Sequence, residues 1–132
     1  MWLFHLLIGL ATLVIFLVTG KYMRADFPDK DAIPQDLRLL MRSRHIYILF
    51  SSLLHLIASA YVQFRPQIWR RSAQLTGTFF LTLGSILLIW AFIWETYYAT
   101  RFSDLSLSGI FASAAGVLLH LIGGTTGQKH ER

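Results

Sequence analysis

The stretch from Arg42 to His55 reads RSRHIYILFSSLLH and decides the fold. Basic residues lead directly into an apolar helix, and a second histidine lies ten residues after the first. An imidazole placed deep in hydrocarbon is unfavourable unless it faces other protein groups. The stretch therefore predicts a membrane helix with one polar face, and the rest of the chain should supply the helices that cover this face.

The composition agrees with a membrane environment. The chain has 132 residues, of which 55% are hydrophobic and 14% are charged, whereas soluble domains carry about 25% charged residues. It contains no cysteine, which excludes disulfides, thiolate metal sites and iron–sulfur ligation by this chain. The net charge of +5 comes from basic residues between the apolar runs. Lysine and arginine at such positions set topology and meet lipid headgroups, so we expect the bilayer and anionic headgroups as partners, and no nucleic acid.

Four apolar runs predict an all-α integral membrane bundle of four transmembrane helices, with residues 1–132 as one domain. A run of about 20 residues, rising about 1.5 Å each, crosses a hydrocarbon core of about 30 Å. Between the first two runs, helical spacing of leucines after Pro34 predicts either a short interfacial helix or early turns of the next helix. The predicted helices are about 2–20, 45–64, 75–94 and 105–123, with a long polar loop at 21–44.

Lysine and arginine also indicate an orientation. Seven lie on the side of the first and third loops, and five lie on the side of the termini and the second loop. The excess predicts a cytoplasmic first loop and termini outside the cytoplasm. A short chain with compact loops is typical of the bacterial inner membrane, so we expect a multi-pass protein there.

Small and polar residues mark the helix faces that pack together in lipid. At about 100° per residue, one narrow arc of the fourth helix carries six such residues: Ser106, Gly109, Ser113, Gly116, His120 and Gly123. The third helix has a glycine face and a hydroxyl face: Gly77 and Gly84, then Thr78, Thr82 and Ser85. The candidate helix-packing residues are Gly109, Ser113, Gly116 and Gly123. We expect this stripe to pack inside the bundle, with a homodimer face or a larger membrane complex as alternatives.

Three histidines fall on inward faces of different helices. His5 and His120 each lie about 22 Å from the inner-loop end of their helices, and His55 lies about 7 Å from their level. His45 is expected at the surface beside the basic cluster. Two neutral imidazoles at one depth can supply both axial ligands of a haem. The spacing thus makes His5 and His120 candidate ligands of a b-type haem, in an electron carrier that exchanges electrons with quinol.

The haem hypothesis also uses basic residues of the second loop. Arg65, Arg70 and Arg71 are candidate contacts for haem propionates or for lipid headgroups. In having four helices with inward histidines, the layout is similar in kind to bis-histidine membrane b-type cytochromes. No sequence motif assigns the chain to that family.

Other interpretations use the same histidines differently. A transition-metal site of His5, His55 and His120 is opposed by the depth offset, because ligands lie about 2 Å from one ion. Proton-coupled transport through His55 lacks a buried carboxylate, since Glu95 is expected at the membrane interface. Single membrane histidines most often form structural hydrogen bonds. We therefore expect a non-enzymatic accessory protein or complex subunit that packs through small-residue faces, with the haem carrier as the alternative.

Overall fold

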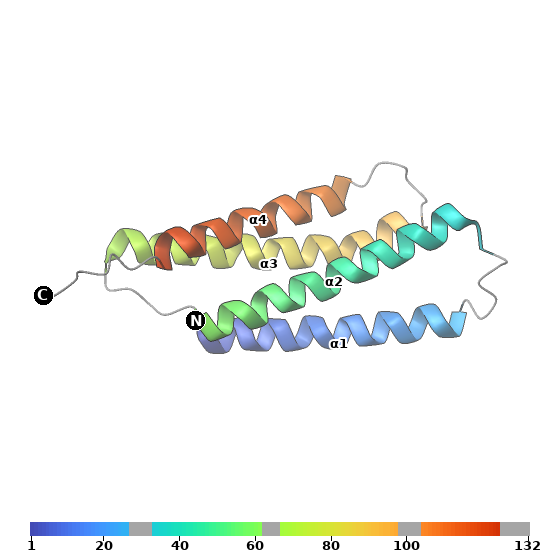
Figure 1. The fold of residues 1–132 in the computed structure, drawn as a ribbon, viewed down its shortest axis with the longest axis horizontal. Helices are drawn as coiled ribbons and strands as arrows, with labels where there is room; N and C mark the ends of the chain where they lie inside the picture. Colours follow the sequence, from blue (N-terminus) through green and yellow to red (C-terminus); the bar gives the residue numbers. More distant parts are fainter. Residues whose placement is uncertain (27–32, 62–66, 98–103, 125–132) are drawn as a thin grey trace, which may run out of the picture.

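The computed structural model describes residues 1–26, 33–61, 67–97 and 104–124, and these residues form an all-helical bundle. The helices are α1 (Trp2–Asp26), α2 (Gln35–Tyr61), α3 (Ile68–Tyr97) and α4 (Asp104–Gly124). Consecutive helices run antiparallel, so α1 begins at the end of the bundle where α4 finishes (Figure 1). α1 packs mainly on α2 and α3 mainly on α4, and contacts between α2 and α3 join the two pairs.

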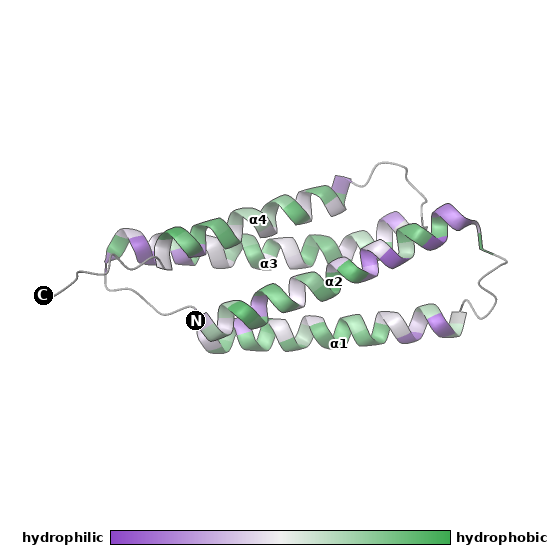
Figure 2. Ribbon diagram, viewed as in Figure 1, coloured by the Kyte–Doolittle hydropathy of each residue, from purple (hydrophilic) through white to green (hydrophobic). Residues whose placement is uncertain are grey.

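Three helices, α1, α3 and α4, are long and apolar enough to cross a membrane, which is consistent with a membrane protein. Within the described residues α2 is not such a candidate. Its serines, histidines and arginines lower its mean hydropathy, and Figure 2 shows hydrophilic residues spread along it. The predicted four-span bundle is therefore observed as three candidate spans and one more polar helix.

The helix bounds differ from the predicted runs. α1 continues to Asp26, α2 already begins at Gln35 and α3 begins at Ile68, so most of the predicted loop at 21–44 is helical. Lysine and arginine allow this extension because their long stems follow the helix while their charges reach water. Pro34 marks the start of α2, since its carbonyl oxygen accepts a hydrogen bond from the Arg38 amide at 3.0 Å. Residues 62–64 of the second predicted run lie outside the described residues.

Facing glycines bring α3 and α4 close together. A Cβ added to Gly77 would lie 2.9 Å from the carbonyl oxygen of Gly116, and one added to Gly84 would lie 2.9 Å from that of Gly109. The arc predicted on α4 is buried at Ser106, Gly109, Ser113, Gly116 and Gly123, and half-buried at His120. The small-residue face of α4 is thus covered by α3 of the same chain.

The interior of the bundle is unusually polar. Buried polar side chains outnumber buried apolar ones among the described residues, while many large apolar side chains face outward. This inverts the usual arrangement of a soluble protein. Several of the polar residues form two clusters. Ile48 on α2 and Leu88 and Ala91 on α3, which have no exposed surface, lie between the two clusters along these helices.

Candidate functional site

The three inward histidines meet in the bundle, each from a different helix. The Nδ1 atoms of His5 and His55 lie 3.0 Å apart, at hydrogen-bonding distance. The Nε2 atoms of His5 and His120 lie 3.2 and 3.3 Å from the hydroxyl oxygen of Thr78 on α3. The group therefore joins all four helices, and His5 and His55 are fully buried.

Hydroxyl groups of α2 and α3 extend this group into a continuous chain, which we call the histidine network: Ser51, Ser85, His55, His5, Thr78 and His120. His55 Nε2 lies 3.1 Å from the Ser85 hydroxyl. The Thr78 hydroxyl lies 2.9 Å from the carbonyl oxygen of Gln74, and the Ser85 hydroxyl lies 3.0 Å from that of Leu81. A backbone acceptor is thus available at each end.

The network has two complete hydrogen-bond arrangements. A hydroxyl and a neutral imidazole each carry one polar hydrogen, which fixes the direction of every bond once one is chosen. In one arrangement, each group donates to the next in the order Ser85, His55, His5, Thr78 and the carbonyl of Gln74. In the other arrangement, each group donates to the next in the order Thr78, His5, His55, Ser85 and the carbonyl of Leu81. All imidazoles stay neutral in both, and the two central histidines exchange tautomers.

His120 and Ser51 keep the same role in both arrangements. When the Thr78 hydroxyl donates to Gln74 or to His5, as in these two arrangements, His120 donates to it from Nε2. The Nδ1 atom of His120 is buried and has no hydrogen-bond partner among the described residues. Ser51 donates to the Ser85 oxygen at 2.5 Å. His120 and Ser51 are therefore donors in both arrangements, and only the hydrogen bonds from Ser85 through His55 and His5 to Thr78 reverse direction.

This geometry does not fit a haem between His5 and His120. Their ring centroids are 5.2 Å apart with the planes at 72°. Both Nε2 atoms lie at hydrogen-bonding distance from the Thr78 hydroxyl, whereas the two axial ligands of a haem must bind opposite faces of the macrocycle. Of the predicted propionate contacts, Arg65 lies outside the described residues. Arg70 is half-buried beside its neighbour Trp69, and Arg71 is exposed.

The predicted metal site is not formed in this arrangement either. The depth offset expected for His55 does not keep it away, because its ring centroid lies 5.1 Å from that of His5. Even so, no three His, Cys, Asp or Glu side chains in the described part of the chain are placed to hold a metal ion. The three histidines interact with each other and with hydroxyls.

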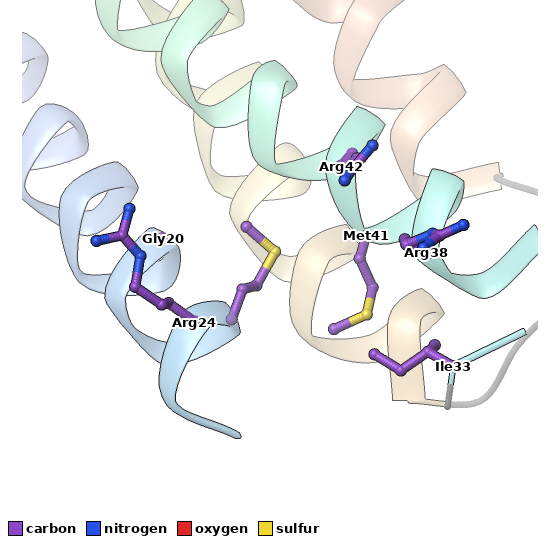
Figure 3. Close-up of a pocket in the computed structure, with 7 residues that line it drawn as sticks. Gly20, Arg24, Ile33, Arg38, Met41 and Arg42 are labelled. Carbon is purple, nitrogen blue, oxygen red and sulfur yellow. The ribbon is translucent and has the colours of Figure 1, made fainter. Parts of the chain in front are cut away.

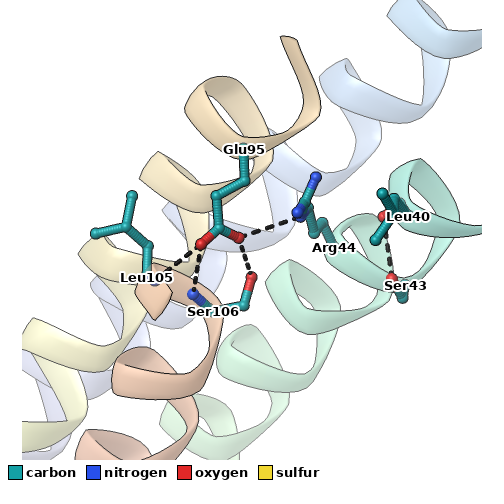
Figure 4. Close-up of polar contacts among 6 residues, drawn as sticks. All are labelled: Leu40, Ser43, Arg44, Glu95, Leu105 and Ser106. Carbon is teal, nitrogen blue, oxygen red and sulfur yellow. Dashed lines mark hydrogen bonds and ion pairs between the residues drawn. The ribbon is translucent and has the colours of Figure 1, made fainter. Parts of the chain in front are cut away.

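A second buried cluster was not predicted. Arg44 Nε lies 3.2 Å from Glu95 Oε2, and the two side chains are 1% and 3% exposed (Figure 4). Glu95 also accepts hydrogen bonds from the amide of Leu105 at 2.8 Å and from the hydroxyl of Ser106 at 2.6 Å. It therefore caps the start of α4 while it pairs with α2. Glu95 lies near the end of α3, as expected, but its side chain and that of Arg44 are buried between the helices instead of exposed at the surface.

His45 also departs from its predicted surface position. Its ring stacks on Phe16 with centroids 4.1 Å apart, and its Nδ1 lies 3.1 Å from the hydroxyl of Thr19. The residue is half-buried between α1 and α2. It belongs to the packing of this pair rather than to a headgroup site.

Comparison of the chain with protein-family models, curated proteins and solved structures found no match. Functional conclusions therefore depend on the geometry of the two clusters. The histidine network holds donors and acceptors in one line, and the Arg44–Glu95 cluster holds a balanced pair of charges. Both tie α2 to the other helices.

Proposed function

We propose that the chain is a four-span, non-enzymatic component of the bacterial inner membrane. The observation that carries this proposal is the distribution of side chains on α2. Ser51, Ser52, His55 and Arg44 are buried, while every exposed residue between positions 46 and 60 is apolar: Ile46, Phe50, Leu53, Ile57 and Ala60. A helix at a water-facing surface shows the reverse pattern. A helix in lipid turns its polar groups inward, which supports α2 as the fourth span.

Cysteine labelling tests whether α2 crosses the membrane, since the chain has no cysteine of its own. Asp36→Cys places a thiol at an exposed position in the first turn of α2, and Gln67→Cys places one at an exposed position after its end. With a membrane-impermeant maleimide, we expect labelling from opposite sides, with position 36 reached from the cytoplasm. Ser52→Cys is the buried control and should react only after detergent is added. Labelling of positions 36 and 67 from the same side would refute the fourth span.

An accessory or subunit role then requires a contact surface other than the predicted one. The small-residue face of α4 is occupied by α3, so a partner or a second copy must contact the outward apolar residues. Trp90 and Trp94 stack on the exposed side of α3 with ring centroids 6.4 Å apart. Aromatic residues of this kind anchor helices at the headgroup level. We propose association through these outer surfaces, and crosslinking in native membranes with single cysteines beside Trp90 tests it.

A second candidate function is proton transfer along the histidine network. The two opposite hydrogen-bond arrangements favour it, because uptake of one proton at the Ser85 hydroxyl and release of one from the Thr78 hydroxyl convert the first arrangement into the second. Histidine chains serve as proton relays in membranes. Proton flux in proteoliposomes tests this function. His55→Ala should abolish the flux, whereas the control Ser59→Ala should keep it, since Ser59 donates to the carbonyl of Leu56 and lies outside the histidine network. Flux no greater than in protein-free liposomes would leave the network with a structural role alone.

The haem electron carrier has its own test. A reduced-minus-oxidised visible spectrum of the purified protein would show a sharp α-band if haem were bound. Loss of that band in both His5→Ala and His120→Ala would show that the two rings separate to hold the group. A flat spectrum from folded protein would support the hydrogen-bonded network instead.

A further inference from the structure

The histidine network is closed at one end and reaches the surface of the bundle at the other. Its buried members are Ser51, Ser85, His5 and His55. Beyond the two serines, towards the Arg44–Glu95 cluster, Ile48 and Leu88 have no exposed surface. By contrast, Thr78 and His120 are half-buried. The end of the network that holds Thr78 and His120 is therefore its surface end.

A cavity at the opposite end of the bundle does not change this. It has a volume of about 200 Å³ and lies between the end of α1 and the start of α2 (Figure 3). His5, in contrast, lies in the first turn of α1, and His55 lies in the second half of α2. No member of the histidine network is among the described residues that line the cavity, so the cavity does not open the network towards that end.

His120 differs from the other two histidines in having a ring nitrogen to spare. His5 and His55 each use both nitrogens within the network. The Nε2 atom of His120 lies 3.3 Å from the Thr78 hydroxyl, whereas its Nδ1 atom is buried without a hydrogen-bond partner among the described residues. A buried polar atom that lacks a partner is unfavourable and often marks a functional group.

The position of His120 gives this nitrogen a route to water. His120 lies one turn before Gly124, where α4 ends. The last turn of a helix opens at a much lower free energy than the middle of a packed bundle. Water therefore reaches Nδ1 of His120 more readily than it reaches the fully buried His5 and His55.

We infer that His120 is the group through which the histidine network exchanges protons with the end of the bundle where α1 begins and α4 finishes. This inference rests on the proton transfer proposed for the network. A neutral imidazole suits the role, because it can accept a proton at one nitrogen and give a different proton from the other. His120 is therefore a relay residue in addition to a hydrogen-bond donor.

Each proton in this exchange moves along an observed contact. In the arrangement in which Thr78 donates to His5, a proton binds Nδ1 of His120, and the Nε2 proton of His120 passes to the Thr78 oxygen. The Thr78 proton moves to Nε2 of His5, and the Nδ1 proton of His5 moves to Nδ1 of His55. The Nε2 proton of His55 then moves to Ser85, which releases its own. One proton enters, one leaves, and every group is neutral before and after.

The surroundings of His120 favour onward transfer of a bound proton. The titratable side chains that face it are His5 on α1, with ring centroids 5.2 Å apart, and His55 on α2. From α3 it meets Gly77 and Thr78, which do not titrate. Neither histidine can act as a counter-ion, and a buried cation without one is unfavourable. An imidazolium at position 120 should therefore pass its proton on or return it.

Proton flux in proteoliposomes tests the inference with two variants of one residue. His120→Gln keeps an N–H donor for Thr78 but has no nitrogen that can relay a proton. We expect the flux to fall about a hundredfold, as is typical when a positioned proton-transfer group is lost. His120→Ala should show the same loss and recover when imidazole is added. Parental flux in folded His120→Gln, checked by circular dichroism, would overturn the inference.

Two further histidine variants are the controls for the flux measurement. His45→Ala should keep the parental flux, because His45 is also half-buried and also contacts a hydroxyl, that of Thr19, but lies outside the network. His55→Ala should lose the flux and should not recover it with imidazole, since His55 is fully buried. Recovery of both His55→Ala and His120→Ala would show that the network is open elsewhere and would overturn the inference.

Nitrogen-15 NMR of histidine-labelled protein tests the inference without a flux. The spectra distinguish protonated from unprotonated ring nitrogens, and single variants assign them. As the pH falls, Nδ1 of His120 should be the first unprotonated nitrogen of the network to gain a proton. Earlier protonation of His5 or His55 would overturn the inference even in a protein that conducts protons. If the parent shows no flux but His120 is protonated first, transfer through the network fails while His120 stands as the site of proton exchange.

Discussion

Exchange of Glu95 for glutamine removes a negative charge from a site that still holds Arg44. Loss of one partner of a buried ion pair destabilises a protein by about 3–5 kcal/mol, because the other charge stays buried. Glutamine keeps one oxygen that can accept the hydrogen bond from the Leu105 amide, so most of the helix cap should survive. We expect Glu95→Gln to lower the free energy of unfolding by about 3 kcal/mol. Glu95→Ala, which also loses the cap, should cost about 1 kcal/mol more.

A double-mutant cycle identifies the pair as the cause. Arg44→Met alone should destabilise the protein by about 3 kcal/mol, for the same reason. The combination with Glu95→Gln removes both charges, and replacement of a buried pair by neutral groups is often close to neutral in stability. The double variant should therefore be more stable than either single variant, with a coupling energy above about 2 kcal/mol.

Unfolding in mixed micelles, followed by circular dichroism against the fraction of denaturing detergent, measures these differences. Arg42→Met is the matched control, because Arg42 is exposed two residues away, and it should change stability by less than about 0.5 kcal/mol. Hydrogen exchange gives a local readout, since the amides of Leu105 and Ser106 should lose protection in Glu95→Ala. Single variants that match the parent, with additive effects in the double variant, would show that the two side chains are solvated and would refute the reasoning.

Other substitutions test the packing and the histidine network in the same titration. Gly116→Leu should destabilise the α3–α4 pair by about 3 kcal/mol, because its Cβ would lie 2.8 Å from the Leu81 amide nitrogen; Gly124→Ala, with nothing within 4 Å, should cause no loss. His55→Ala leaves polar partners unsatisfied and should cost about 2 kcal/mol, and a change below about 0.5 kcal/mol would contradict a connected network. Ser52→Ala removes one interhelical hydrogen bond and should cost only about 0.6 kcal/mol.

Helix periodicity predicted which faces pack because lipid leaves only small and polar residues to mark a contact. On α3 the two predicted faces make different contacts. Gly77 and Gly84 face α4, while Thr78 and Ser85 bond histidines of α1 and α2. The same rule explains the buried arc of α4. The face of a helix on which a residue lies depends only on the sequence of that helix, so these faces could be predicted.

Distances between helices could not be predicted in this way. The offset assigned to His55 assumed straight and parallel helices, whereas α2 crosses α1 obliquely (Figure 1), and the two imidazoles reach each other. Arg44 and Glu95 were treated as the ends of apolar runs because hydropathy falls at any charge. The predicted loops that contain Arg44 and Glu95 lay on the same side of the membrane. The presence of opposite charges on one side was the signal in the sequence that could have identified the pair. Its burial depends on how α2, α3 and α4 converge.

The layer of Ile48, Leu88 and Ala91 makes the two polar clusters energetically independent. Arg44 and Ser51 are seven residues apart on α2, a rise of about 10 Å, and Ile48, which lies between them on the same face, offers no side-chain hydrogen-bonding group. Substitutions in separate clusters at such a distance usually have additive effects. Each end of the bundle can therefore change its polar residues over evolution without compensation at the other end, so that one half can diverge while the other is retained.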